Sequence, residues 1–197
     1  MTGHGRSLPD KETLLRRVRP HRDGWRLSAK PRHMEPVGPG EESVWDFPRP
    51  PAVEPVAEPI KVVHRGHTVA ATTNGLRVLE TAGAPVYHIP IADVDMSCLV
   101  ENGHLTVCEW KGAAVYYDLV VDGHTVQDAA YTYPDPFDDL GRGFDALADT
   151  IVFYASRVDE AYVGEEKVSP QPGGYYSGWV TSRLKGPIKG GPGTEGW

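Results

Sequence analysis

From residue 60 onward, short hydrophobic runs alternate with turn-forming residues along the chain. The runs are rich in Val, Thr and Tyr, and Gly, Asn, Asp and Pro separate them, which is the pattern of an antiparallel β fold. The runs 61–64 and 67–71 flank Arg65-Gly66, so they predict a hairpin with a two-residue turn. Further elements are expected as strands at 76–80, 151–155 and 160–163, and as short helices within 91–100 and 139–149.

The strongest turn signal is Asp122-Gly123, which lies between two alternating runs within residues 112–133. A two-residue turn there would pair Tyr117 with Asp128. Because every second side chain of a strand lies on the same face, this register predicts one apolar surface that carries an amine, a phenol and a carboxylate. Its members would be Lys111, Val115, Tyr117, Leu119, Val126, Asp128 and Ala130. Polar groups on such a surface cost free energy unless they bond to each other or to a ligand.

The composition excludes a helical bundle. The 197 residues include 18 Pro and 22 Gly, and 40% of the residues are hydrophobic, which is enough for a globular core. Eight of the prolines lie between residues 31 and 59. Proline has no N–H donor and a fixed φ, so this segment is predicted to be extended chain. Within it, Val44, Trp45 and Phe47 are expected to be buried against the domain.

Charge is distributed unevenly along the chain. Residues 1–33 hold nine Lys and Arg against three acidic residues, a local charge of +6, so the rest of the chain carries −13. We expect this basic arm to dock on its own acidic domain or on a neighbouring copy, and we expect no nucleic-acid partner because the body is acidic. Residues 11–18 could form two helical turns with Leu14, Leu15 and Val18 on one side.

Other sequence features concern the compartment and the end of the chain. No stretch has the roughly 20 apolar residues of a membrane span, and the first residues lack the apolar region of a signal peptide. We therefore expect a cytoplasmic protein with no membrane partner, in which Cys98 and Cys108 are free thiols. Nine glycines from residue 164 onward predict an irregular C-terminal extension that Trp179 and Trp197 hold to the body.

Several runs of this sequence are similar to those of a known family. They are VWDFPRPP (44–51), RVLE (77–80), VYHIPIADV (86–94), CEWKGAAVYYD (108–118), DAAYTYPDP (128–136), VFY (152–154) and GWVTSRLKGPIKGGPGTEGW (178–197). On these residues the chain resembles the bacterial domain-of-unknown-function family four-two-seven, whose members are sometimes labelled nucleotidyltransferase-like. The resemblance covers 44–197 and implies a compact, mainly antiparallel, tent-like β domain without a proven reaction. Glu109, Ile188 and Glu195 depart from the family's pattern, whereas Cys108, Lys111 and Asp128 keep it.

Pattern and resemblance together predict three segments. They are a basic, Pro-rich N-terminal arm (1–43), a β domain of the family (44–163) and a Gly/Pro-rich C-terminal extension packed on that domain (164–197). The expected fold class is mainly β, an antiparallel tent-like or barrel-like domain with one or two short helices.

Lys111 is the first candidate for chemistry. A lysine at the mouth of an apolar sheet face can have its pKa lowered by desolvation and act as a base, a Schiff-base nucleophile or an anion anchor. The alternative is a structural ion pair with Glu80 or Asp128. These two carboxylates could themselves form an acid–base pair, or each could bond to a tyrosine hydroxyl, as Tyr117 would for Asp128.

Cys108 and a group of tyrosines complete the candidate site. On a regular strand Cys108 would face away from Lys111 unless a bulge reorients it, and it is a candidate nucleophile or a small buried hydrophobe. The tyrosines expected to line an aromatic pocket or to pack in the core are Tyr87, Tyr116, Tyr117, Tyr131 and Tyr133.

Common cofactor and metal motifs are not found. Neither Cys-x-x-Cys nor His-Glu-x-x-His occurs, the Gly-rich end lacks Gly-Lys-[Ser/Thr], and no Gly-x-Gly-x-x-Gly follows a strand, so no metal and no cofactor are expected. The sequence predicts a β domain whose recessed pocket binds, and could transform, a small anionic or carbonyl-bearing ligand around Lys111, positioned by Glu80, Tyr117 and Asp128. The alternative is a noncatalytic interaction module that acts, or self-associates, through the basic N-terminal arm.

Overall fold

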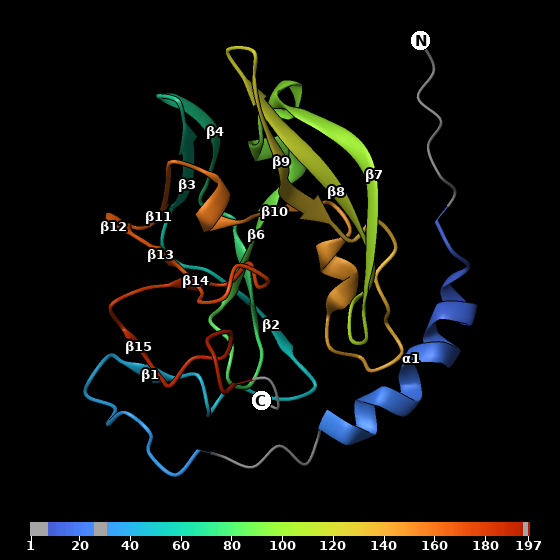
Figure 1. Cartoon of the computed structure of the whole chain (residues 1–197), viewed down its shortest axis with the longest axis vertical. Helices are drawn as coiled ribbons and strands as arrows, with labels where there is room; N and C mark the ends of the chain where they lie inside the picture. Colours follow the sequence, from blue (N-terminus) through green and yellow to red (C-terminus); the bar gives the residue numbers. More distant parts are fainter. Residues whose placement is uncertain (1–7, 26–30, 195–196) are drawn as a thin grey trace.

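The chain folds into a mainly β structure, described here for residues 8–25, 31–194 and 197 of a computed structural model (Figure 1). The helices are α1 (Lys11–Trp25) and the 3₁₀-helices η1 (Ile91–Asp93), η2 (Met96–Cys98), η3 (Phe144–Leu147) and η4 (Ala155–Arg157). The strands are β1 (Glu42–Ser43), β2 (Ala52–Pro55), β3 (Ile60–His64), β4 (His67–Thr72), β5 (Leu76–Leu79), β6 (Val86–Pro90), β7 (Leu99–Cys108), β8 (Gly112–Val121), β9 (His124–Thr132), β10 (Thr150–Phe153), β11 (Glu160–Val163), β12 (Glu166–Lys167), β13 (Ser169–Pro170), β14 (Trp179–Val180) and β15 (Leu184–Lys185).

Two larger sheets organise the domain. The seven-stranded sheet has the order β2-β5-β6-β10-β9-β8-β7, and the four-stranded sheet has the order β12-β11-β3-β4. All pairings in both are antiparallel. Two small sheets pair β13 with β14 and, in parallel, β1 with β15. Among the described residues the seven-stranded sheet has β2 and β7 as its edges, so it is open and not a closed barrel.

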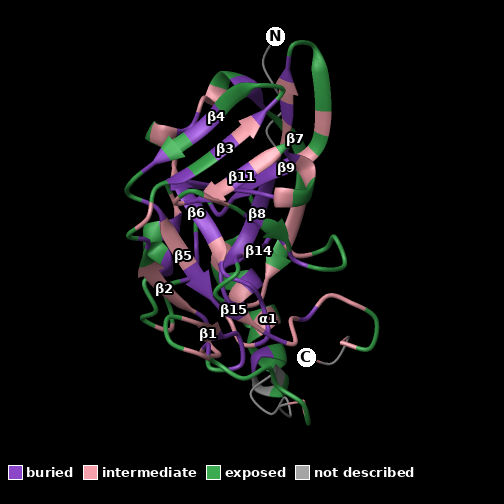
Figure 2. Ribbon diagram, turned by 90° about the vertical axis from the view of Figure 1, so that its left-hand side faces the viewer, coloured by how far each residue is buried: buried purple, intermediate pink, exposed green. Residues whose placement is uncertain are grey.

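The main core lies between the two larger sheets (Figure 2). Val62, Val69 and Ala161 from the four-stranded sheet pack in one cluster with Leu119 and Phe153 from the seven-stranded sheet. All five side chains are at most 2% exposed. Burial of apolar area at about 25 cal/mol per Å² is the main contribution that holds the sheets together.

Local sequence patterns predicted several elements correctly. The hairpin around Arg65-Gly66 forms as β3 and β4, and β11 spans the predicted residues 160–163. The short helix expected within 91–100 is instead two 3₁₀ turns, η1 and η2, followed by β7. Val94 and Leu99, which end these turns, both have extended backbone angles, so no α-helix can run through the segment.

The register of the β8–β9 hairpin differs from the prediction beyond Leu119. Leu119 pairs with Val126 as expected, but Tyr117 pairs with Ala130 and not with Asp128. The cause is a bulge in β9, where Asp128 has a φ of 51° and its amide donates to Asp118 Oδ1 at 3.0 Å instead of joining the ladder. Asp128 is thereby removed from the predicted apolar surface.

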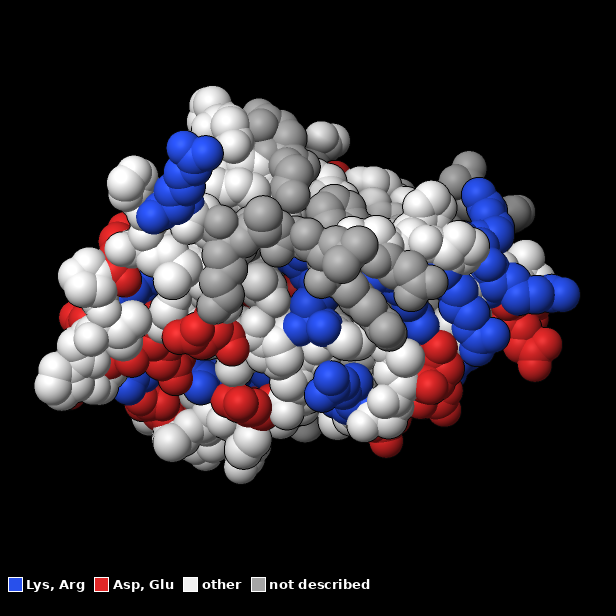
Figure 3. All heavy atoms as spheres, turned by 90° about the horizontal axis from the view of Figure 1, so that it is seen from below, with Lys and Arg blue, Asp and Glu red and all other residues white. Residues whose placement is uncertain are grey.

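The described part of the N-terminal arm contacts the domain. Helix α1 is longer than the predicted two turns and lies beside β8 (Figure 1), with Leu14 packed on Ala113 and Phe137. The Arg22 guanidinium pairs with Asp139 at 2.7 Å and also donates to the Glu109 carbonyl at 2.6 Å. Seen from below, basic and acidic side chains are interspersed at this end of the molecule (Figure 3). The basic residues Arg6, Arg26 and Lys30 lie outside the described residues.

The Pro-rich segment and the C-terminal extension pack on each other. Val44, Trp45 and Phe47 are buried, as predicted. The Trp45 indole donates to the Pro187 carbonyl at 2.7 Å and lies 5.2 Å, between centroids, from the ring of Trp197. These contacts hold the C-terminal extension against the Pro-rich segment. No helix among the described residues is long and apolar enough to cross a membrane.

Candidate functional site

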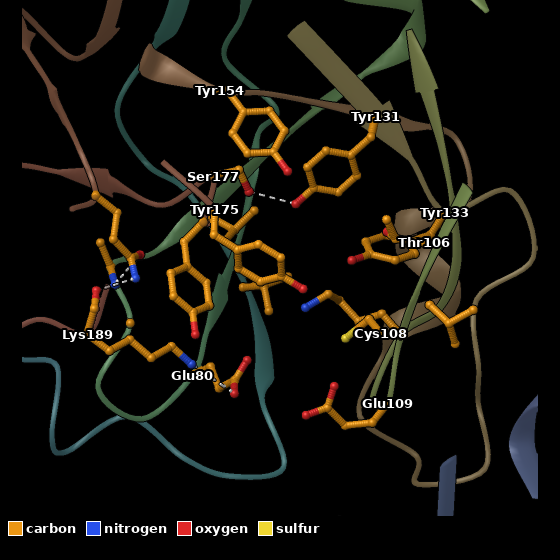
Figure 4. A pocket seen from close by; sticks show the side chains of 18 of the residues that line it. Glu80, Thr106, Cys108, Glu109, Tyr131, Tyr133, Tyr154, Tyr175, Ser177 and Lys189 are labelled. Carbon is orange, nitrogen blue, oxygen red and sulfur yellow. Dashed lines mark hydrogen bonds and ion pairs between the residues drawn. The ribbon is translucent and has the colours of Figure 1, made fainter. Parts of the chain in front are cut away.

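A cavity of about 270 Å³ lies on the face of the seven-stranded sheet that points away from the main core (Figure 4). Strands β5 to β9 contribute the sheet side of the lining, and Arg49, the loop after β5 and the C-terminal extension contribute the rest. The charged, hydroxyl and thiol side chains of the lining belong to Arg49, Glu80, Thr106, Cys108, Glu109, Lys111, Tyr116, Tyr131, Tyr133, Tyr154, Tyr175, Tyr176, Ser177 and Lys189.

Lys111 reaches this cavity because the alternation of β8 does not extend to it. It lies in the turn between β7 and β8, and the following Gly112 has a φ of 102°, a conformation that favours glycine. Trp110, 1% exposed, anchors the turn, and the Lys111 carbonyl accepts from the Phe137 amide at 3.1 Å. Lys111 is therefore on the side of Tyr133, not on the predicted surface with Tyr117.

The Lys111 side chain is buried without a hydrogen bond. It is 6% exposed, and its Nζ lies 5.6 Å from the centroid of the Tyr133 ring. Among the described residues, no oxygen or sulfur atom accepts a hydrogen bond from Nζ, although ammonium groups this deeply buried are normally paired. An ammonium at this depth without an acceptor is the unusual feature of the cavity.

The pKa of Lys111 is shifted in the direction opposite to the one that the sequence suggested. Burial by itself disfavours the ammonium, but the Cys108 sulfur, which ionises only at alkaline pH, and the Glu80 carboxylate outweigh it and raise the pKa of Lys111 above its ordinary value. The expectation of a lowered pKa considered desolvation alone and omitted the carboxylate across the cavity. At neutral pH the group is an ammonium, which suits an anion anchor and not a base or a Schiff-base nucleophile.

Glu80 is held by two other cations. Its Oε1 lies 3.4 Å from Lys189 Nζ and 3.4 Å from an Arg49 nitrogen. Burial alone would raise the pKa of Glu80, but the charges of Lys189, Lys111 and Arg49 together lower it. Glu80 thus forms ion pairs with Lys189 and Arg49, and not the ion pair with Lys111 that the sequence left open.

On the sheet side of the cavity, some tyrosine hydroxyls are hydrogen-bonded to neighbouring hydroxyls and one is not. Tyr131 is hydrogen-bonded to Ser177 at 2.7 Å, and the Tyr116 hydroxyl contacts those of Thr106 and Tyr154 at 3.1 and 3.4 Å. Tyr133 makes no such bond among the described residues, and Figure 4 shows its hydroxyl pointing into the cavity. Burial raises the pKa of Tyr131 to about 12 and that of Tyr133 well above its ordinary value, so both hydroxyls stay protonated.

Cys108 lines the cavity close to Lys111. It ends β7 opposite Gly112, and because Lys111 lies in the turn rather than on a strand, both side chains reach the same space. Burial raises the pKa of the Cys108 thiol despite the opposing charge of Lys111. The sulfur is therefore a neutral thiol at pH 7, which is a poor nucleophile.

Three of the predicted site residues lie elsewhere. Asp128 projects from its bulge toward Asn102 and His104, with contacts of 2.8 and 3.0 Å. Tyr117 packs against the main core, as its pairing with Ala130 requires. Tyr87 is stacked on Trp179 in the same core, 5.1 Å between ring centroids. The structure does not bring Asp128, Tyr117 or Tyr87 to the cavity.

Several lining residues were missed by the sequence analysis. Arg49, Tyr154, Tyr175 and Tyr176 were not singled out. Arg49 and Tyr154 lie in the family-like runs 44–51 and 152–154, which was the one available signal. Their joining at one cavity depends on long-range packing, which local patterns do not report.

The comparison with protein families matches residues 52–164 to a family described as Domain of unknown function (DUF427). The chain belongs to the DUF427 family. The match contains Glu80, Cys108, Lys111 and the tyrosines of β8 and β9, whereas Arg49 and Lys189 lie outside it. No curated protein matches the chain. In this DUF427 protein the sheet side of the cavity is thus family sequence, and the opposite side comes largely from the flanking arms.

Proposed function

We propose that the cavity binds a small molecule through an anionic or carbonyl group, held by the Lys111 ammonium and the Tyr133 hydroxyl. The observation that carries the proposal is the buried, charged Lys111, which faces the cavity without an acceptor among the described residues. A buried donor without a partner costs free energy that a bound acceptor would recover.

The chemistry of the free groups defines what can bind. Lys111 Nζ and the protonated Tyr133 hydroxyl are both hydrogen-bond donors, so they complement an oxygen acceptor such as a carboxylate, a phosphate or a polarised carbonyl. Three basic and two acidic side chains line the cavity, which leaves a net positive charge. The volume of about 270 Å³ limits the ligand to a small molecule.

Binding is favoured over conversion of the ligand. A Schiff base would require Lys111 to lose its proton, and nucleophilic attack would require Cys108 to lose its own. The raised pKa values of both groups oppose these steps at neutral pH. The site therefore supports a binding function best, with Cys108 as the one nearby group that could react once a ligand changes its surroundings.

Thermal denaturation of the full chain tests the proposal. We would screen inorganic phosphate, small carboxylates, sugar phosphates, nucleotides and aldehydes against wild type, Lys111→Met and Lys167→Met. Lys167 is a half-exposed surface residue paired with Glu160, so Lys167→Met reproduces the charge change outside the cavity. We expect at least one anion class to raise the melting temperature of wild type and Lys167→Met but not of Lys111→Met. Identical profiles of all three proteins would contradict the proposal.

The alternative function, interaction through the basic N-terminal arm, is less well supported. The described helix α1 uses Lys11 on Asp135 at 2.9 Å and Arg22 on Asp139 at 2.7 Å. These basic groups are engaged by the acidic domain of the same chain. The observations therefore favour the cavity over the arm.

A further inference from the structure

Three side chains that can bind a metal ion meet at the end of the four-stranded sheet, outside the Lys111 cavity. They are His67 at the start of β4, Asp95 just before η2 and Cys98 at the end of η2. Their ligand atoms all lie within 4.8 Å of one another. None of the three lines the Lys111 cavity, so this cluster is independent of the proposed function.

Two of the three distances between the ligand atoms are near those of a tetrahedral site, and the third, between His67 and Cys98, is within 4.8 Å. Asp95 Oδ2 lies 2.9 Å from His67 Nε2 and 3.5 Å from Cys98 Sγ. An ion at the usual zinc distances would separate such atoms by roughly 3.3–3.6 Å.

The Asp95 carboxylate is already oriented for this role. Its Oδ1 accepts hydrogen bonds from the Ser97 amide at 3.1 Å and the Ser97 hydroxyl at 2.5 Å, so Oδ2 is the oxygen left facing His67 and Cys98. Bonds from Ser97 and His67 lower the pKa of Asp95 to about 2, so the group is ionised at neutral pH. Outer-shell bonds of this kind commonly fix the ligands of metal sites.

We propose that His67 Nε2, Asp95 Oδ2 and Cys98 Sγ bind a zinc-like divalent transition-metal ion, with the fourth position open to water. One nitrogen, one oxygen and one sulfur donor suit Zn²⁺ better than Mg²⁺ or Ca²⁺, which prefer oxygen ligands. Binding forms one metal–thiolate bond, and the Cys98 thiol proton leaves to solvent. The side chains of His67 and Asp95 are 45% and 37% exposed, which gives the ion a path of entry.

Such an ion would join two segments that are already aligned. The Asp95 amide donates to the Val69 carbonyl at 2.8 Å, and Val94 forms a bridge with Ala70. The metal would therefore fasten the β3–β4 hairpin to the η2 segment that leads into β7. We expect bound Zn²⁺ to raise the melting temperature of the full chain.

Cobalt titration of the chelator-treated full chain tests the site. We expect one equivalent of Co²⁺ to give a thiolate-to-cobalt band in the near ultraviolet and visible bands typical of four-coordination, both removed by Zn²⁺. Cys98→Ser should lose the near-ultraviolet band, His67→Ala should weaken binding by about 10-fold or more, and Cys108→Ser should behave as wild type.

The variants separate a built site from incidental binding. A near-ultraviolet band that survives Cys98→Ser, or that disappears in Cys108→Ser, would overturn the proposal. Unchanged affinity in His67→Ala, or the absence of stoichiometric binding by wild type, would overturn it as well. Cys98 is buried, so Cys98→Ser could fail to fold. His67 is exposed, so His67→Ala should fold and decides the question in that case.

Discussion

The two sides of the Lys111 cavity place similar lysines in different surroundings. Lys111 on the sheet side and Lys189 on the C-terminal side are both 6% exposed. Lys189 Nζ lies 3.4 Å from Glu80 and 4.9 Å from the Tyr176 ring centroid, whereas Lys111 Nζ lies 5.6 Å from the Tyr133 ring centroid and has no hydrogen-bond acceptor among the described residues. Burial alone thus does not distinguish a structural lysine from a functional one. Our proposal of a ligand at Lys111 rests on the second difference, the missing acceptor among the described residues.

The largest expected effect is on stability. Lys189→Met leaves the Glu80 carboxylate with one fewer partner, so it should lower the free energy of unfolding by on the order of 1–3 kcal/mol. Lys111→Met breaks no hydrogen bond among the described residues and removes only the longer-range attraction between Lys111 and Glu80, so it should lower the free energy of unfolding by less, about 1 kcal/mol or below. Urea unfolding of both variants at pH 7 measures the difference, and a larger loss for Lys111→Met would reverse our assignment of the two lysines.

The hydroxyl groups of the cavity provide a second, smaller contrast. Ser177→Ala removes the bond to Tyr131 and should cost about 0.5–1.5 kcal/mol of unfolding free energy. Tyr133→Phe removes a hydroxyl that has no hydrogen-bond partner in the part of the chain that the structure describes, so it should leave stability nearly unchanged and weaken the anion response. Urea unfolding and the anion screen, run on both variants, would contradict this account if Tyr133→Phe destabilised the protein more than Ser177→Ala.

The acid side of the stability profile tests the Glu80 cluster. The folded-state pKa of Glu80 is lowered, so its ion pairs stabilise the protein above the ordinary pKa of about 4.3, and this contribution is lost as the pH falls through the folded value. Glu80→Gln should therefore show a shallower loss of stability between pH 5 and pH 3 than wild type. Urea midpoints across that range measure it, and parallel curves would show that Glu80 is not coupled to its cations.

Asp128 should give the smallest effect on the cavity. It lies in the β9 bulge and contacts Asn102 and His104, away from the lining residues. Asp128→Asn should leave the anion response unchanged and cost less than about 1 kcal/mol, because its partner His104 is half-exposed. An anion response lost in this variant would restore Asp128 to the site.

Local patterns predicted the elements, but not which residues share a face near the site. Strand alternation and the Asp122-Gly123 turn depend on neighbouring residues, and they placed Leu119 opposite Val126 correctly. Two backbone features with positive φ, at Gly112 and Asp128, then break the alternation. For that reason Lys111 moved to the cavity face and Asp128 left the predicted surface.

The identity of Lys111 as a candidate could be predicted, but its surroundings could not. A lysine beside apolar strands indicated a site, and Glu80 and Cys108 do lie around the same cavity. Arg49 and Lys189, which pair with Glu80, each lie more than 60 residues from Lys111, one before it and one after it along the chain. Their approach to Glu80 depends on tertiary packing, so the sequence did not show that Lys111 would lack an acceptor among the described residues.

The central claim is that an external anion binds at Lys111, which has no acceptor among the described residues, and not at Lys189, which is paired with Glu80. The most direct measurement is a crystal of the full chain soaked in bromide, with anomalous scattering used to locate the ion. We predict a bromide peak in contact with Lys111 Nζ and the Tyr133 hydroxyl, and no peak between Lys189 and Glu80. A cavity without bromide while surface lysines hold it, or a peak at Lys189 alone, would contradict the account.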